Sequence, residues 1–132
     1  MHARAPDRGL AAARLTARLV ARELAAIGIT MNCAPVVDLP VAGAHDIIGD
    51  RAYGDTPAKV AALAAAVAEG LADGGVLPVM KHIPGHGRAE VDSHHALPVV
   101  NARRQDLEQV DFPPFAAFAD APMAMTAHVI YT

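Results

Sequence analysis

The feature that most constrains the fold is a regular alternation of helix-like and strand-like segments along the 132 residues. Apolar residues recur at helical spacing in some segments, and nearly continuous apolar runs lie between them. No connection between two strand-like runs is short enough for a hairpin, which predicts an α/β fold with about three parallel strands and crossover helices. In chain order we expect helix 8–27, strand 29–38, helix 57–73, strand 76–82, one or two helices in 102–119 and strand 122–131.

The first helix has two chemically different faces. Arg14, Arg18 and Arg22 recur four residues apart, which predicts a solvated face. The other face is expected to be an apolar stripe packed on the core, formed by Leu15, Leu19, Val20, Leu24 and Ile27.

Proline and glycine mark the limits of the other segments. Thr56 and Pro57 suit the N-cap and first turn of the second helix, and Gly74 suits its end. Pro78 weakens the prediction of strand 76–82, because proline cannot donate to a sheet. Pro113–Pro114 predicts a break in the last helical segment.

Each strand-like run ends in polar groups. The first ends at Asp38, the second at Lys81 and His82, and the third at His128. Because ligands bind at the carboxyl ends of parallel strands in α/β folds, these groups predict an active site on one rim.

The loop after the second strand, KHIPGHGRAEVDSHH at 81–95, contains four of the seven histidines. Its prolines and glycines exclude a helix, so the spacing of His82 and His86 does not indicate a helical zinc pair. A metal site remains one alternative, with ligands drawn from His82, His86, Asp92, His94, His95 and His128.

Residues of this loop also occur in three other kinds of site: phosphate-binding loops, nucleophilic triads and histidine acid/base pairs. PGHGR lacks a full phosphate-binding fingerprint, and Ser93 lacks a nucleophile elbow. A histidine acid/base fits better, because Asp92 and His94 are two residues apart and can lie on one side of an extended loop. A carboxylate in that place orients the imidazole and stabilises its protonated form. Arg88 and Glu90 are expected to be exposed loop charges.

The composition and charge of the chain argue against two classes of partner, nucleic acids and membranes. The net charge is −3 and no basic cluster occurs, which argues against nucleic acid. No apolar run is long enough to cross a membrane and no signal peptide is recognisable, so we expect a cytoplasmic protein without a membrane partner. The single cysteine, Cys33, lies in an apolar run and is expected to be buried.

KHIPGHG, followed five residues on by DSH, resembles the KHFPGHG and DSH signature of bacterial β-N-acetylhexosaminidases of glycoside hydrolase family 3. The segments GITMNCAPVVDLP, IIGDRAYGDTP and MTAHVIY resemble other motifs of that family in the right order. Together these matches span about residues 10–132, and they are most similar to β-N-acetylglucosaminidases of peptidoglycan recycling.

The resemblance implies a TIM-like (β/α)8 barrel and a role for each matching residue. His94 would be the general acid/base and Asp92 its dyad partner. Arg51, Lys81 and His82 would bind N-acetylglucosamine. The loop would be shaped by Pro84, Gly85, His86 and Gly87, and no cofactor or metal is implied.

A whole barrel takes about 250 residues. Residues 1–132 are therefore expected to be the central portion of a single barrel domain, without its first and C-terminal strands. The family's nucleophile is an aspartate on a later strand; Asp38 resembles a structural strand-end residue instead.

The expected activity is that of a retaining exo-β-N-acetylglucosaminidase acting on peptidoglycan fragments. The alternatives are a catalytically incomplete sugar-binding fragment and a metal-dependent barrel hydrolase.

Overall fold

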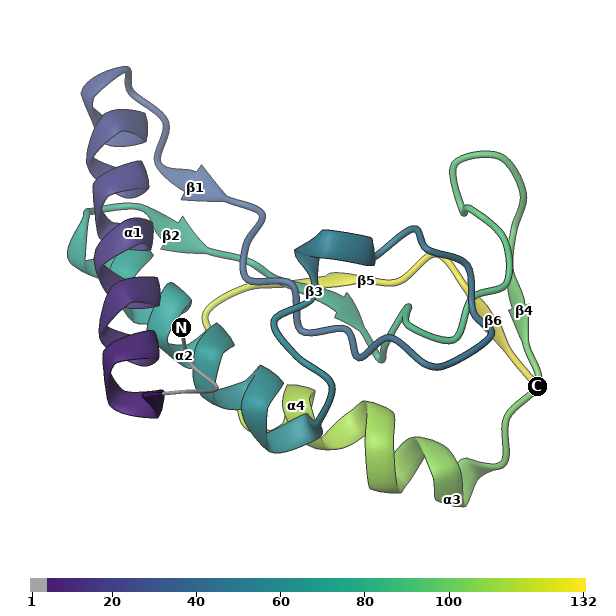
Figure 1. The fold of residues 1–132 in the computed structure, drawn as a ribbon. Coiled ribbons are helices and arrows are strands. Elements are labelled where there is room, and N and C mark those ends of the chain that lie inside the picture. Colours follow the sequence, from purple (N-terminus) through teal and green to yellow (C-terminus); the bar gives the residue numbers. More distant parts are fainter. Residues whose placement is uncertain (1–4) are drawn as a thin grey trace.

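The computed structural model describes residues 5–132, whose helices and strands follow the expected order (Figure 1). Most of the helices are α-helical, η1 is a 3-10 turn and η2 a π-helical turn. The elements are α1 (Pro6–Ala26), β1 (Met31–Asn32), η1 (Gly49–Arg51), α2 (Pro57–Asp73), β2 (Leu77–Pro78), β3 (Met80–Ile83), β4 (Val99–Val100), α3 (Arg104–Asp106), η2 (Leu107–Asp111), α4 (Phe112–Ala116), β5 (Ala124–Thr126) and β6 (Ile130–Tyr131).

The strands pair in parallel, as the alternation predicts. β1 pairs with β2, β3 with β5 and β4 with β6, and a bridge between Val36 and Lys81 extends the contact of the first two segments. The second extended segment therefore lies between the first and the third. β4 was not predicted, because its two residues lie in what reads as loop.

Helices α1 and α2 lie side by side (Figure 1), and small residues form their contact. Ala17 and Ala21 of α1 are buried against α2. A Cβ on Gly70 would overlap the backbone oxygen of Arg14, and one on Gly74 would overlap the Cβ of Ala21. The two helix backbones therefore approach too closely for large side chains between them.

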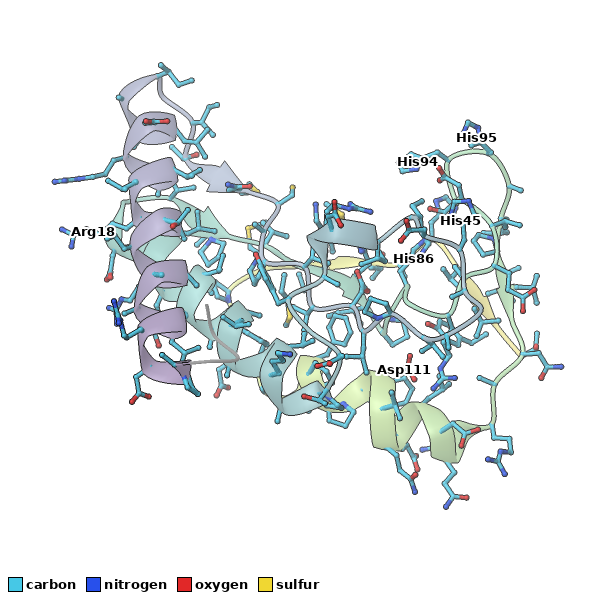
Figure 2. All side chains as sticks on the ribbon, in the orientation of Figure 1. Arg18, His45, His86, His94, His95 and Asp111 are labelled. Atoms are coloured by element: carbon cyan, nitrogen blue, oxygen red, sulfur yellow. The ribbon has the colours of Figure 1, made fainter. Side chains whose placement is uncertain are left out.

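The prediction that the leucine-rich stripe of the first helix faces the core is wrong in this structure. Close approach at Gly70 turns the alanines toward α2 and leaves much of the stripe exposed. The exposed fractions are 56% for Leu15, 54% for Leu19, 41% for Val20 and 74% for Ile27. Arg14 bonds Asp73 and Glu69 across the helix pair, whereas Arg18 projects into solvent as expected (Figure 2).

The core joins the strand ends to the helices. One buried cluster contains Val37, Leu39, Val60, Ala64, Met80 and Phe115. It packs the ends of the first and second extended segments on α2 and α4, and so fixes where their polar terminal residues lie. Thr56 caps α2, since its side chain accepts from the Lys59 N–H at 3.4 Å.

The expected break at Pro113–Pro114 does not occur. The chain is helical from Arg104 to Ala116, and the π turn of η2 immediately precedes the prolines. The prolines are the second and third residues of α4, just after the π turn.

Cys33 is exposed, contrary to the prediction of a buried thiol. It lies directly after the two paired residues of β1. Within residues 5–132, no helix is long and apolar enough to cross a membrane.

Gly70→Ala is expected to lower the free energy of unfolding by about 1–3 kcal/mol, because the added Cβ must push α1 away from α2. Urea unfolding of the protein measures this. Gly54→Ala is the matched control, since its Cβ would meet only the flexible Lys59 side chain. Equal stability of the two variants would contradict the close helix contact.

Candidate active site

One cavity brings most of the predicted site residues together. Its volume is about 380 Å³, and it opens between the 3-10 turn, β3, the histidine loop and the last extended segment. The lining residues are Ile47, Ile48, Arg51, Lys81, His82, His86, Ser93, His94, Met125, Thr126 and His128. Lys81 and His82, from the end of the second predicted strand, and His128, from the third, therefore lie around one cavity.

Asp38 lies beneath this cavity with no exposed surface. Its Oδ1 accepts hydrogen bonds from the backbone N–H of His82 at 3.2 Å and of His86 at 2.8 Å. Its Oδ2 lies 2.6 Å from Nδ1 of His82. Both oxygens are therefore engaged in fixing the loop, which makes Asp38 a structural residue and not an available nucleophile.

His82 and His86 form the inner part of the site. Their rings meet edge to face, with centroids 5.7 Å apart. His86 is only 4% exposed, and burial lowers its pKa below the ordinary value. Its Nε2 lies 3.0 Å from Oγ of Ser93, whereas its Nδ1 has no hydrogen-bond partner within residues 5–132.

Asp92 and His94 are hydrogen-bonded to each other, and His94 lies at the outer tip of the loop (Figure 2). Asp92 Oδ1 lies 2.7 Å from Nδ1 of His94 and also accepts its backbone N–H at 2.8 Å. That backbone hydrogen bond, followed by the ring, lowers the pKa of the Asp92 carboxyl below its usual value. The His94 side chain is 79% exposed, so it projects from the loop; His95 beside it is 85% exposed.

The two predicted sugar-binding cations reach the cavity from different elements. Arg51 ends the 3-10 turn η1 and donates to the backbone oxygens of Ile47, at 2.5 Å, and Ile48, at 3.4 Å. Lys81 lies on β3, half-buried. The turn therefore holds Arg51 over the rim on which Lys81 and His82 end.

The predicted loop-shaping residues lie at the base of the loop. Pro84 follows β3, and Gly85 has a φ of 139°, which side-chain-bearing residues rarely adopt. A Cβ on Gly87 would overlap the carbonyl oxygen of Leu39. Tyr131 of β6 donates its hydroxyl to the Gly85 carbonyl, so the third extended segment also fixes the loop.

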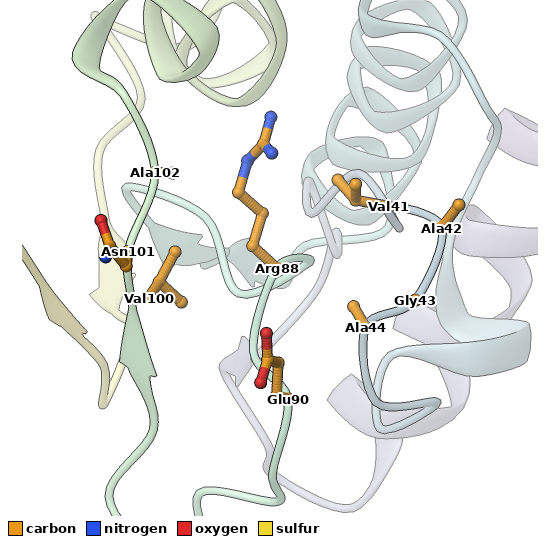
Figure 3. Close-up of a pocket in the computed structure, with 9 residues that line it drawn as sticks. All are labelled: Val41, Ala42, Gly43, Ala44, Arg88, Glu90, Val100, Asn101 and Ala102. Carbon is orange, nitrogen blue, oxygen red and sulfur yellow. The ribbon is translucent and has the colours of Figure 1, made fainter.

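The prediction that Arg88 is an exposed loop charge is wrong. Its Nε donates to Oδ2 of Asp111 at 2.7 Å, and the Asp111 side chain is only 2% exposed. Glu90 is exposed as predicted. Both line a second cavity of about 250 Å³ on another side of the loop (Figure 3), which contains none of the predicted site residues.

The sequence did not indicate the roles of Ser93, Asp111 and Tyr131. Each contacts a residue at least seven positions away, and no local pattern announces such contacts. For the alternative of a metal-dependent hydrolase, the structure offers no set of ligands within residues 5–132. No group of three or more His, Cys, Asp or Glu there could hold a metal ion.

Asp38→Ala is expected to lower the free energy of unfolding by about 2–5 kcal/mol, since it leaves two loop N–H groups without their acceptor. Denaturant unfolding measures the loss. Asp50→Ala, at an exposed position, is the control. If both variants unfolded alike, Asp38 would not organise the loop.

The substitution Tyr131→Phe tests the contact between Tyr131 and Gly85, because its effect on the free energy of unfolding should depend on pH. Burial first, then the nearby Asp111 and Asp38 charges, raise the pKa of Tyr131 from 10.0 to about 12. A raised pKa stabilises the fold fully below pH 10.0, and this contribution is lost as pH rises toward 12.

The unchanged protein is thus expected to be more stable than Tyr131→Phe by about 1 kcal/mol near neutrality. That advantage should shrink in urea unfolding at about pH 11. Tyr53 is present in both proteins, so its own ionisation cancels. An advantage that grows with pH would be the opposite result.

Comparison with known proteins places the chain in a family. The model of the glycosyl hydrolase family 3 N-terminal domain matches residues 2–132. The beta-hexosaminidase of Chromobacterium violaceum is 42% identical over 127 residues, which are 95% of this chain and 35% of that protein. Beta-hexosaminidase LpqI of Mycobacterium tuberculosis is 44% identical over 110 residues, which are 82% of this chain and 28% of that protein.

A solved structure agrees with these relatives. Native NagZ from Neisseria gonorrhoeae superposes with a TM-score of 0.85 at 41% identity, over 92% of this chain and 36% of that chain. The chain therefore spans about a third of the length of the relatives it matches. Its parallel strands and crossover helices are part of a TIM-like barrel, and the chain belongs to glycosyl hydrolase family 3.

Proposed function

We propose that the protein carrying this chain is a retaining exo-β-N-acetylglucosaminidase. The observation that carries the proposal is the Asp92–His94 pair beside a cavity lined by Arg51, Lys81 and His82. Sugar recognition and proton transfer would thus lie side by side, as a glycosidase requires.

His94 would act as the general acid and then as the general base. Its Nδ1 is bonded to Asp92, which leaves Nε2 to face the glycosidic oxygen. As the bond between the anomeric carbon and the leaving oxygen breaks, that oxygen takes the proton of His94. The neutral imidazole then takes a proton from the water that attacks the anomeric carbon and frees the nucleophile.

The nucleophile would form the covalent glycosyl intermediate. In the family that the sequence resembles it is an aspartate on a later strand, so this chain would supply the acid/base and part of the sugar site. Histidine has one physical advantage over an Asp or Glu side chain here: neither of its protonation states is negatively charged, so an anionic leaving group or substrate does not repel it.

The cavity suits a single sugar ring. Its volume of about 380 Å³ lies in the range of small-ligand sites. Arg51 and Lys81 supply donors for hydroxyl or acetamido oxygens, and His82 adds a ring held by Asp38. NagZ from Neisseria gonorrhoeae, which matches with a TM-score of 0.84, was solved in complex with N-trifluoroacetyl-D-glucosamine.

The proposed substrates are peptidoglycan fragments with a terminal N-acetylglucosamine, such as N-acetylglucosamine linked to 1,6-anhydro-N-acetylmuramic acid peptides. The proposed setting is cell-wall recycling in the cytoplasm. The sequence resemblance supports both parts. A chain that only binds sugar would make the same cavity contacts without turnover, so hydrolysis is the property to test.

His94→Ala is expected to slow hydrolysis of a phenyl N-acetyl-β-glucosaminide by about 10²–10⁴-fold, because the poor leaving group needs the proton. The dinitrophenyl analogue needs no proton to leave, so its cleavage step should change far less. Steady-state and burst kinetics of the protein carrying this chain measure both effects.

His95→Ala is the matched control, since His95 is the exposed neighbour of His94 and its Nε2 lies 3.9 Å from Asp92. Its rates should stay near those of the unchanged protein. Unchanged phenyl-glycoside hydrolysis in His94→Ala would refute the acid/base assignment. No hydrolysis by the unchanged protein, together with saturable N-acetylglucosamine binding, would favour the sugar-binding alternative.

A further inference from the structure

One hydrogen bond connects the buried base of the histidine loop with its exposed tip. It joins Nε2 of His86 to Oγ of Ser93 at 3.0 Å, and we refer to it as the latch. Ser93 stands between Asp92 and His94 in the chain, so the latch reaches the middle of the proposed acid/base pair.

The tip has little else to fix it. The other hydrogen bonds of the tip are local: the N–H groups of His95 and Ala96 donate to the Asp92 backbone oxygen, both at 3.0 Å, and His94 bonds the Asp92 side chain. Within residues 5–132, the latch is the hydrogen bond that ties residues 91–97 to the rest of the molecule. Val91 and Leu97 are also exposed, at 40% and 51%, so packing contributes little.

The inner end of the latch is rigid by comparison. His86 is 4% exposed, its N–H donates to Asp38 at 2.8 Å, and its ring packs against His82. Burial keeps the pKa of His86 below the ordinary value. A neutral imidazole can donate to a serine hydroxyl or accept from it, so the pair suits either tautomer.

If the His86 ring only filled space, an apolar ring would give a more stable fold. Nδ1 of His86 is buried with no partner within the described residues, which costs stability that an apolar ring would not lose. The contact with Ser93 is the interaction that an apolar ring at this position would lack.

We propose that Ser93 and His86 are positioning residues that hold the Asp92–His94 pair over the sugar cavity through the latch. This inference rests on the proposed glycosidase function. Neither residue transfers the proton. They restrict where His94 lies, and a displacement of about 1 Å of a catalytic group can cost about 10²-fold in rate.

The test is Ser93→Ala, which removes one hydroxyl from a partly exposed turn. Hydrolysis of the phenyl glycoside should fall by about tenfold or more, whereas the cleavage step of the dinitrophenyl glycoside should stay near its original rate. Competitive inhibition by N-acetylglucosamine should not change, since Arg51, Lys81 and His82 remain in place. Ser93→Thr, which keeps a hydroxyl, should restore the rate.

A second measurement does not depend on activity. Backbone ¹⁵N relaxation of residues 92–96 should show greater motion in Ser93→Ala and in His86→Phe, with α2 unchanged. Equal loss on both glycosides, or unchanged relaxation at the tip, would overturn the latch. If the unchanged protein hydrolyses neither glycoside, the proposed function fails, and the relaxation data alone still decide whether the latch positions the tip.

Discussion

The site depends on one buried carboxylate, Asp38. Parallel pairing of the first two extended segments, through the bridge between Val36 and Lys81, brings Asp38 beneath the start of the histidine loop. There its two oxygens accept from the loop backbone and meet the His82 ring. A carboxylate without exposed surface needs such partners, because burying it unpaired is costly. The same contacts fix the backbone of the glycine- and proline-rich segment 82–87, which lies at the base of the cavity.

The site has two parts that are attached to the fold in different ways. The inner part consists of Arg51, Lys81 and His82, which are attached to the 3-10 turn and the strand ends. The outer part consists of Asp92 and His94, on an exposed turn. In the proposed glycosidase, the inner part would bind the sugar and the outer part would carry the acid/base group. The contact between His86 and Ser93 connects the two parts.

The alternation of segments was sufficient to predict the parallel α/β arrangement, and the ends of the apolar runs were sufficient to predict the rim. The orientation of α1 was not predictable, because its alanines and its leucines both recur at helical spacing. The choice depends on Gly70, which admits the Arg14 backbone and so turns the alanine face inward. Likewise, Pro113–Pro114 signals a break unless a π turn precedes it, as η2 does.

Within the site, the loop motif contains several of the residues that line the cavity, but it does not show which contacts support them. The contacts of Tyr131 with Gly85, Arg88 with Asp111, and His86 with Ser93 depend on how the loop folds back on distant segments. Such contacts join residues at irregular distances along the chain, so no periodic pattern in the sequence predicts them. Asp38 was visible as a strand-end polar residue, and the family resemblance implied a structural role for it. The hydrogen bonds of both its oxygens with the loop are visible only in the structure.

The central claim is that the cavity beside the Asp92–His94 pair binds N-acetylglucosamine. A crystal structure of the protein with this sugar tests it most directly. The account predicts the sugar ring against Arg51, Lys81 and His82, with its anomeric end toward His94. Density for the sugar in the cavity beside Arg88 and Glu90, or no sugar in either cavity at saturating concentration, would contradict it.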